Sequence, residues 1–108
     1  MKENIFLITV FEKCELSDSW YFDFDLGATR SVGFRNTLKD AEEVVKNNMC
    51  DIWETCYHYA CIEELSPMLY PHCENSYYYK YNKDIDGYEN IETPELLKNQ
   101  YFPIGGIG

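Results

Sequence analysis

Positive charge is scarce in this chain of 108 residues, which has nine lysines and arginines against nineteen aspartates and glutamates. Its formal net charge is −10. Proteins that hold DNA or RNA neutralise the phosphate backbone with clusters of lysine and arginine, and the sequence contains no such cluster. We therefore expect no nucleic acid among its partners. The acidity is compatible with an ordinary acidic protein, or with a mimic of nucleic acid that binds a basic protein.

Long hydrophobic segments are also missing. The apolar run at residues 5–11 is far shorter than the roughly 20 residues that a membrane-spanning helix needs. No signal-peptide cleavage pattern follows this run. We expect a protein of the cytoplasm that does not contact a membrane. The length of 108 residues and the hydrophobic share of 45% fit a single domain over residues 1–108.

The five cysteines include no CxxC pair, and their number is odd. In a cytosolic chain this pattern favours free or buried thiols over a disulfide framework. A zinc site made from these cysteines with His58 and His72 would need ligand spacings that match no known zinc motif. The sequence therefore predicts neither a metal nor a cofactor.

Motifs that mark enzymes are absent from the sequence, which has no phosphate-binding glycine loop, no GxSxG and no HExxH. The glycines at 105–108 lack the following helix that a dinucleotide motif requires. A cysteine and a histidine that meet only in the folded chain remain an alternative. The adjacent acids Glu63 and Glu64 are typical of a solvated strand end. We expect a protein that is not an enzyme.

One amphipathic helix is predicted near the middle of the chain. Thr37 can cap its first turn by accepting a hydrogen bond from the third backbone N–H after it. Glu42 and Lys46 form a favourable i,i+4 pair, and Asn47 or Asn48 offers a left-handed C-cap. The apolar positions recur at helical spacing and form one stripe: Leu38, Ala41, Val44, Val45 and Met49.

Apolar runs and alternating patterns predict strands on both sides of this helix. Asp86 and Gly87 mark a hairpin, and a short C-terminal helix begins with Thr93 as its cap and Pro94 after it. Residues 19–25 form either a strand or an ordered loop. The fold class is therefore α+β, a mainly antiparallel sheet of four or five strands with one principal helix packed on it. The predicted strands are residues 5–11, 29–35, 51–65, 77–81 and 88–91.

Alternation in the strand at 51–65 predicts which of its residues face the helix. Ala60 and Ile62, with His58, point toward the helix, whereas Tyr57 and Tyr59 point to the opposite side. That aromatic side and the apolar C-terminal tail exceed what one helix can cover, so we expect a homo-oligomer. Docking on the domain or on a neighbouring subunit is predicted for the apolar residues of the tail: Phe102, Ile104 and Ile107.

The two arginines of the chain, Arg30 and Arg35, lie in one short predicted strand beside Gly33. Regular alternation places Arg30 with Val32 and Phe34 on one side and Arg35 on the other. Gly33 marks a bulge or a close approach of backbone or ligand. A guanidinium binds phosphate or carboxylate through two hydrogen bonds. A salt bridge to a neighbouring acid is the alternative role for each arginine.

Aromatic residues make up 17% of the chain, including ten tyrosines. Aromatic rings stack on nucleotide bases while arginine contacts the phosphate. A site for an anionic nucleotide is therefore predicted, with Arg30 and Arg35 joined by aromatic residues: Trp20, Tyr57, Tyr59 and Tyr79. Half-buried positions in the sheet, or a surface that binds protein, are the alternatives for these aromatics.

Several segments carry a resemblance to a known group of proteins. They are VGF at 32–34, AEEVVKNN at 41–48, DIWE at 51–54, YHYACIE at 57–63, YP at 70–71, the tyrosine-rich residues 77–81, Pro94, and GIG at 106–108. Together they resemble a family of small uncharacterised proteins of phages, prophages and gut Firmicutes. Cys61, where an aliphatic residue is more usual, and residues 19–25 depart from the pattern. The second departure bears on a ligand site.

The resemblance implies a non-catalytic inhibitor of bacterial immunity. In this class, a sponge binds and sequesters a nucleotide second messenger, of cyclic ADP-ribose type or a cyclic nucleotide, usually as a homo-oligomer. A phage-encoded protein would act in the cytoplasm of the host cell. The alternative is an acidic inhibitor that binds a host defence protein directly, as a mimic of nucleic acid.

Overall fold

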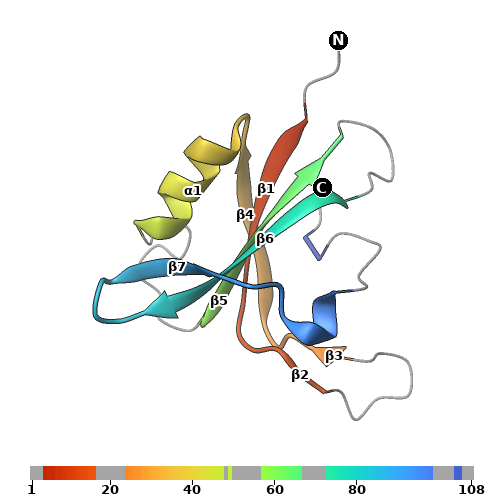
Figure 1. Ribbon diagram of the computed structural model, residues 1–108, viewed down its shortest axis with the longest axis vertical. Helices are drawn as coiled ribbons and strands as arrows, with labels where there is room; N and C mark the ends of the chain where they lie inside the picture. Colours follow the sequence, from red (N-terminus) through yellow and green to blue (C-terminus); the bar gives the residue numbers. More distant parts are fainter. Residues whose placement is uncertain are drawn as a thin grey trace.

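The computed structural model describes residues 4–16, 24–47, 49, 57–66, 73–98 and 104–105. Within these residues, five antiparallel strands form one sheet in the spatial order β4-β1-β5-β6-β7. Helix α1 (Leu38–Lys46) lies across one face of this sheet (Figure 1). The α+β fold predicted from the sequence is confirmed. The strands are β1 (Ile5–Phe11), β4 (Thr29–Arg35), β5 (Tyr59–Leu65), β6 (Cys73–Asn82) and β7 (Gly87–Ile91).

Three smaller elements complete the described chain. β2 (Glu15–Leu16) and β3 (Phe24–Asp25) follow β1 and precede β4 in the chain, and they pair with each other. Most of the predicted segment 19–25 lies outside the described residues. The predicted C-terminal helix is the single 3-10 turn η1 (Glu95–Leu97). Its N-cap is Pro94, with an extended ψ of 140° and no side-chain hydrogen bond. The predicted capping role of Thr93 is therefore wrong, because the turn starts one residue later.

The ends of α1 largely follow the sequence prediction. Thr37 Oγ1 accepts a hydrogen bond of 3.2 Å from the N–H of Asp40, and Lys46 Nζ lies 3.4 Å from Glu42 Oε2. The predicted left-handed C-cap is wrong for Asn47, which has φ −95° and donates from its side-chain amide to the backbone carbonyl of Glu43. Asn48, the other predicted cap, lies outside the described residues. Met49 follows the end of α1 and is 61% exposed, so it is not part of the apolar stripe. No helix in the described part of the chain is long and apolar enough to cross a membrane.

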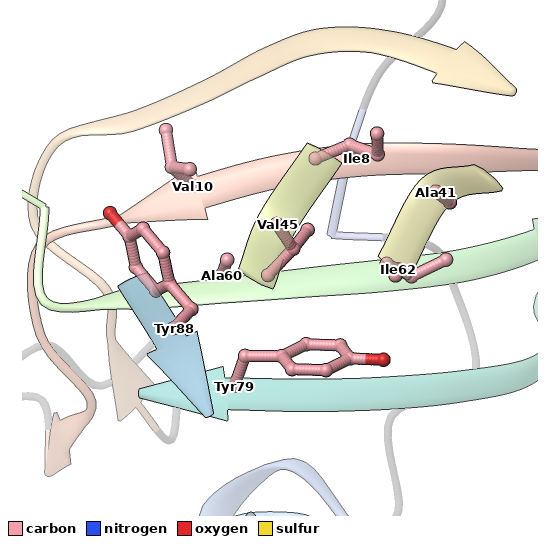
Figure 2. Close-up of a cluster of buried hydrophobic side chains, with 8 residues drawn as sticks. All are labelled: Ile8, Val10, Ala41, Val45, Ala60, Ile62, Tyr79 and Tyr88. Atoms are coloured by element: carbon pink, nitrogen blue, oxygen red, sulfur yellow. The ribbon is translucent and has the colours of Figure 1, made fainter. Parts of the chain in front are cut away.

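The larger hydrophobic core fills the space between α1 and the sheet, on a side that we call the helix face. Ala41 and Val45 of α1 are fully buried against Ala60 and Ile62 of β5, as predicted, while Leu38 is half-buried at the margin. Figure 2 shows the buried side chains of this core: Ile8, Val10, Ala41, Val45, Ala60, Ile62, Tyr79 and Tyr88.

A second core covers the opposite side of the sheet, which we call the far face. Its buried residues are Phe11, Cys61, Tyr78 and Leu97. Ile104 also packs there, so one of the three predicted docking residues of the tail is confirmed, and the other two lie outside the described residues. The chain therefore covers part of its own far face with η1 and residues 104–105.

The strand predicted at 51–65 is shorter than expected in its described part, where β5 begins only at Tyr59. His58 precedes the strand and is exposed, with Nδ1 3.0 Å from the carbonyl oxygen of Glu12, so its predicted inward orientation is wrong. β6 is longer than predicted because it pairs with β5 along the whole length of β5. The hairpin from β6 to β7 is confirmed, with Asp86 in the left-handed region at φ +47°.

Candidate functional site

A β-bulge interrupts β4 where it pairs with β1. Ile8 lies opposite Gly33 and the next residue, Thr9, lies opposite Ser31, so Val32 is the extra residue in β4. Gly33 has φ +150°, which side-chain-bearing residues rarely adopt. The bulge predicted from Gly33 is confirmed.

The bulge reverses the alternation that the sequence predicted for β4. Residues opposite each other in an antiparallel pair point to the same face. Arg30 lies opposite Val10 and Arg35 lies opposite Phe6, and both partners belong to the helix-face core. Both arginines are therefore on the helix face, although regular alternation would put them on opposite faces.

Phe34 takes the other side of the strand. It lies opposite Leu7 on the far face and is 50% exposed. The prediction that Phe34 shares a side with Arg30 and Val32 is wrong, since the extra residue shifts the alternation by one position.

Among the described strands β4 pairs only with β1, so the two arginines occupy an outer strand of this sheet. Both side chains are exposed, and Arg35 donates from its Nη1 to the carbonyl oxygen of Phe34 over 3.0 Å. No acidic residue occurs in β4. Arg30 and Arg35 lie opposite residues four steps apart on β1, which corresponds to roughly 13 Å between their Cα atoms, so the two guanidinium groups lie along different parts of the edge.

Tyr59 lies on the far face, away from the arginines. Its ring stacks on Phe11 with centroids 5.2 Å apart and planes 7° apart, and Lys80 Nζ lies 5.9 Å from the ring centroid. The structure therefore does not bring Tyr59 together with Arg30 and Arg35.

Tyr79 is on the helix face but in its core. Its side chain is fully buried, and its hydroxyl donates to Glu42 Oε2 over 3.0 Å. Burial, followed by the nearby Glu42 carboxylate, raises the pKa of the Tyr79 hydroxyl far above its ordinary value. The hydrogen bond of Tyr79 links β6 to α1, and its ring has no exposed surface on which a ligand could stack.

Tyr57 packs against the helix-face core and is half-buried, and its carbonyl oxygen accepts a 3.0 Å hydrogen bond from the Tyr88 hydroxyl. Its predicted orientation with Tyr59 is wrong, because Tyr57 lies before β5 and does not follow the alternation of that strand. Trp20 lies outside the described residues. Of the predicted site residues, the structure thus unites the two arginines on one face and leaves Tyr59 on the other.

Comparison with known proteins leaves the site to be interpreted from its own chemistry. A scan of protein-family models and searches of curated proteins and of solved structures found no significant match to the chain.

One group that the sequence reasoning missed is the carboxylate of Glu63. It is 1% exposed on the far face, where Oε2 accepts from the backbone N–H of Ile104 over 2.8 Å and Oε1 from that of Gly105 over 2.9 Å. Burial raises the pKa of Glu63, and the two N–H donors partly offset this effect. The prediction of a solvated strand end is wrong for Glu63. The available signal was alternation, which groups Glu63 with the buried Cys61 and Leu65.

Two cysteines adjoin this carboxylate. Burial, followed by the charge of Glu63, raises the pKa of Cys61 well above its usual value and that of Cys73 to about 12. Both thiols are therefore protonated at neutral pH and are weak nucleophiles. Among the described residues no group of three or more histidine, cysteine or acidic side chains is arranged to hold a metal ion.

Proposed function

We propose that this chain is a non-catalytic binding protein that sequesters a nucleotide second messenger, with Arg30 and Arg35 contacting its phosphates. The observation that carries the proposal is the β4 bulge, which supports a shared orientation of both arginines on an exposed outer strand. A net charge of −10 repels phosphate from most of the molecule. A local pair of guanidinium groups is the means by which such a protein holds an anion.

The spacing of the arginines favours a ligand with two anionic groups. With Cα atoms roughly 13 Å apart along the strand, each guanidinium contacts a different phosphate more readily than both contact one. A cyclic dinucleotide offers two phosphates. Because Tyr59 and Tyr79 pack in the two cores, the proposal assigns base stacking to an aromatic side chain other than these two, contributed by a second copy of the chain, so that the site is shared in a homo-oligomer.

Calorimetric titration with cyclic dinucleotides and cyclic ADP-ribose isomers tests this proposal. Wild type should bind at least one of them with one nucleotide per chain, because in a symmetric oligomer a site made from the arginines of one copy and an aromatic side chain of another occurs once for every copy. Arg30→Ala and Arg35→Ala should each weaken binding roughly ten- to a hundredfold, the loss expected for one charge-assisted contact. Lys83→Ala removes an exposed positive charge from the turn between β6 and β7 and should leave affinity unchanged.

Two results would reject parts of the proposal. If wild type binds no nucleotide in the panel, nucleotide sequestration is wrong. If it binds and both arginine variants bind equally well, the function stands and the β4 site is wrong.

The second candidate is an acidic inhibitor that binds a host defence protein. It is favoured by the opposite edge of the sheet, where residues 83–92 carry one exposed lysine against four exposed carboxylates: Asp84, Asp86, Glu89 and Glu92. Such an edge suits a basic protein surface. In this case the nucleotide panel gives no heat of binding, and charge reversal at Asp84 and Glu89 abolishes inhibition of the partner.

A further inference from the structure

The two outer strands of the described sheet differ in charge. β4 carries two exposed arginines, Arg30 and Arg35, and no acidic residue. At the other outer edge, β7 and the turn between β6 and β7 carry exposed carboxylates, including those of Asp84, Asp86 and Glu89. β4 and β7 are the first and last strands in the spatial order. The sheet therefore has a basic edge and an acidic edge at its opposite ends.

Each of these edges also exposes a large apolar side chain. Phe34 in β4 is 50% exposed, and Ile85 in the turn between β6 and β7 is 59% exposed. Among the described residues, the other exposed large apolar side chains are those of Leu16 and Met49. An exposed apolar side chain beside charged groups is typical of a surface that binds protein.

Contacts within the domain hold the acidic edge in place. The Tyr81 hydroxyl donates to Asp86 Oδ1 over 2.8 Å. Gly87 begins β7 directly against α1, where an added Cβ atom would overlap the backbone carbonyl oxygen of Lys46. An edge that is already ordered loses little conformational freedom when it binds a partner.

Charge decides which edges of two copies fit together. Two β4 edges would bring guanidinium groups next to guanidinium groups, and two acidic edges would bring carboxylates together. Like charges placed side by side oppose association. The combination of β4 from one copy with the acidic edge of another brings opposite charges together, in a protein whose net charge of −10 otherwise makes copies repel each other.

We propose that copies of this chain associate head to tail, with β4 of one copy docked on the β6–β7 edge of the next. Each copy uses both edges, so the contact repeats from copy to copy and closes into a ring or extends. The proposal rests on the proposed function for the role of the homo-oligomer and names the contact that builds it. The contact itself forms without nucleotide.

Sedimentation of the full chain without nucleotide, in a concentration series at about 0.15 M salt, tests the contact. Wild type should sediment above the mass of one chain. Two double variants each remove one edge: Arg30→Glu with Arg35→Glu reverses β4, and Asp84→Asn with Glu89→Gln neutralises the acidic edge. Each should need at least tenfold more protein to associate. An equimolar mixture should form a 1:1 dimer, because one variant keeps the acidic edge and the other keeps β4.

The mixture separates a head-to-tail contact from a symmetric one. Self-association of either double variant at the wild-type concentration would overturn the proposal, since a contact between two identical edges survives when the other edge is changed. A monomeric wild type, or a mixture that stays monomeric, would also overturn it. Arg30→Lys with Arg35→Lys is the control, which keeps the charge and should associate within threefold of wild type. Nucleotide binding is judged separately by calorimetry, so failure of sequestration leaves these results unchanged.

Discussion

The hydroxyl of Tyr79 in β6 donates to the carboxylate of Glu42 in α1 over 3.0 Å. Tyr79 is fully buried, and its ring lies in the core between the helix and the sheet (Figure 2). This bond joins the principal helix to a strand 37 positions later in the chain. Tyr79, which the sequence analysis predicted in the nucleotide site, therefore has a structural role.

Tyr79→Phe should lower the free energy of unfolding by about 0.5–1.5 kcal/mol, because it removes one partly buried hydrogen bond. Nucleotide affinity should not change. Tyr81→Phe is the control, since the Tyr81 hydroxyl bonds to the exposed Asp86, and it should cost less than about 0.5 kcal/mol. Urea unfolding and calorimetry measure both quantities. A loss of nucleotide affinity in Tyr79→Phe at unchanged stability would show that Tyr79 contributes to the ligand site.

Val45→Asp should prevent folding at 37 °C. Val45 is fully buried against β5, and an unpaired carboxylate there should cost about 4 kcal/mol or more. Thermal unfolding followed by circular dichroism provides the measurement. Lys39→Ala, an exposed change in the same helix, should leave the midpoint within about 2 °C. An unchanged midpoint in Val45→Asp would show that the helix face is assigned incorrectly.

The fold was predictable from the sequence where local chemistry decides the structure. Thr37 and the i,i+4 pair of Glu42 and Lys46 define α1 through contacts within one or two turns. The alternation that puts Ala60 and Ile62 on one side of β5 determines which side of this strand packs against the helix. These features depend on neighbours close in sequence, so they can be predicted from a single sequence.

The candidate site was less predictable because it depends on register. One extra residue at Val32 moves Phe34 to the far face and leaves Arg30 and Arg35 on the same face. Gly33 indicates that a bulge is present, but the pairing with β1 determines which residue is extra. Glu63 was missed for a similar reason, since its two donors are 41 and 42 positions away.

Gly33→Ala should destabilise the domain by about 1–3 kcal/mol, because φ +150° is unfavourable for a residue with a Cβ atom. The cost is conformational, since no atom lies within 4 Å of the added Cβ. Relaxation of the bulge should also weaken nucleotide binding by changing the relative direction of Arg30 and Arg35. Urea unfolding and calorimetry report the two effects. Thr29→Ala in the same strand is the control, and equal stability of the two variants would contradict the role of the bulge.

The buried Glu63 should make stability depend on pH in a defined direction. Its pKa is raised in the folded chain, so its contribution is fully present below the unfolded value of about 4.3 and is lost as pH rises through the folded pKa. Relative to Glu63→Gln, wild type should lose up to about 1.4 kcal/mol per pH unit in this window. Cys61, Cys73 and Tyr78 face the same region with raised pKa values and stay neutral there.

Urea unfolding of both proteins at half-unit pH steps measures that difference. A wild-type advantage that grows as pH rises would mean that the two N–H donors outweigh burial, and that the pKa of Glu63 is lowered in the folded chain.

The most direct measurement of nucleotide sequestration is the small-molecule content of the protein after expression in cells that produce nucleotide signals. The purified protein is heat-denatured and filtered, and the filtrate is analysed by mass spectrometry. Wild type should release an intact nucleotide with two phosphates, and the Arg30→Ala, Arg35→Ala double variant, prepared in parallel and folded, should release little. A filtrate free of nucleotide from wild type, with no binding of the same compounds when they are added back, would contradict sequestration.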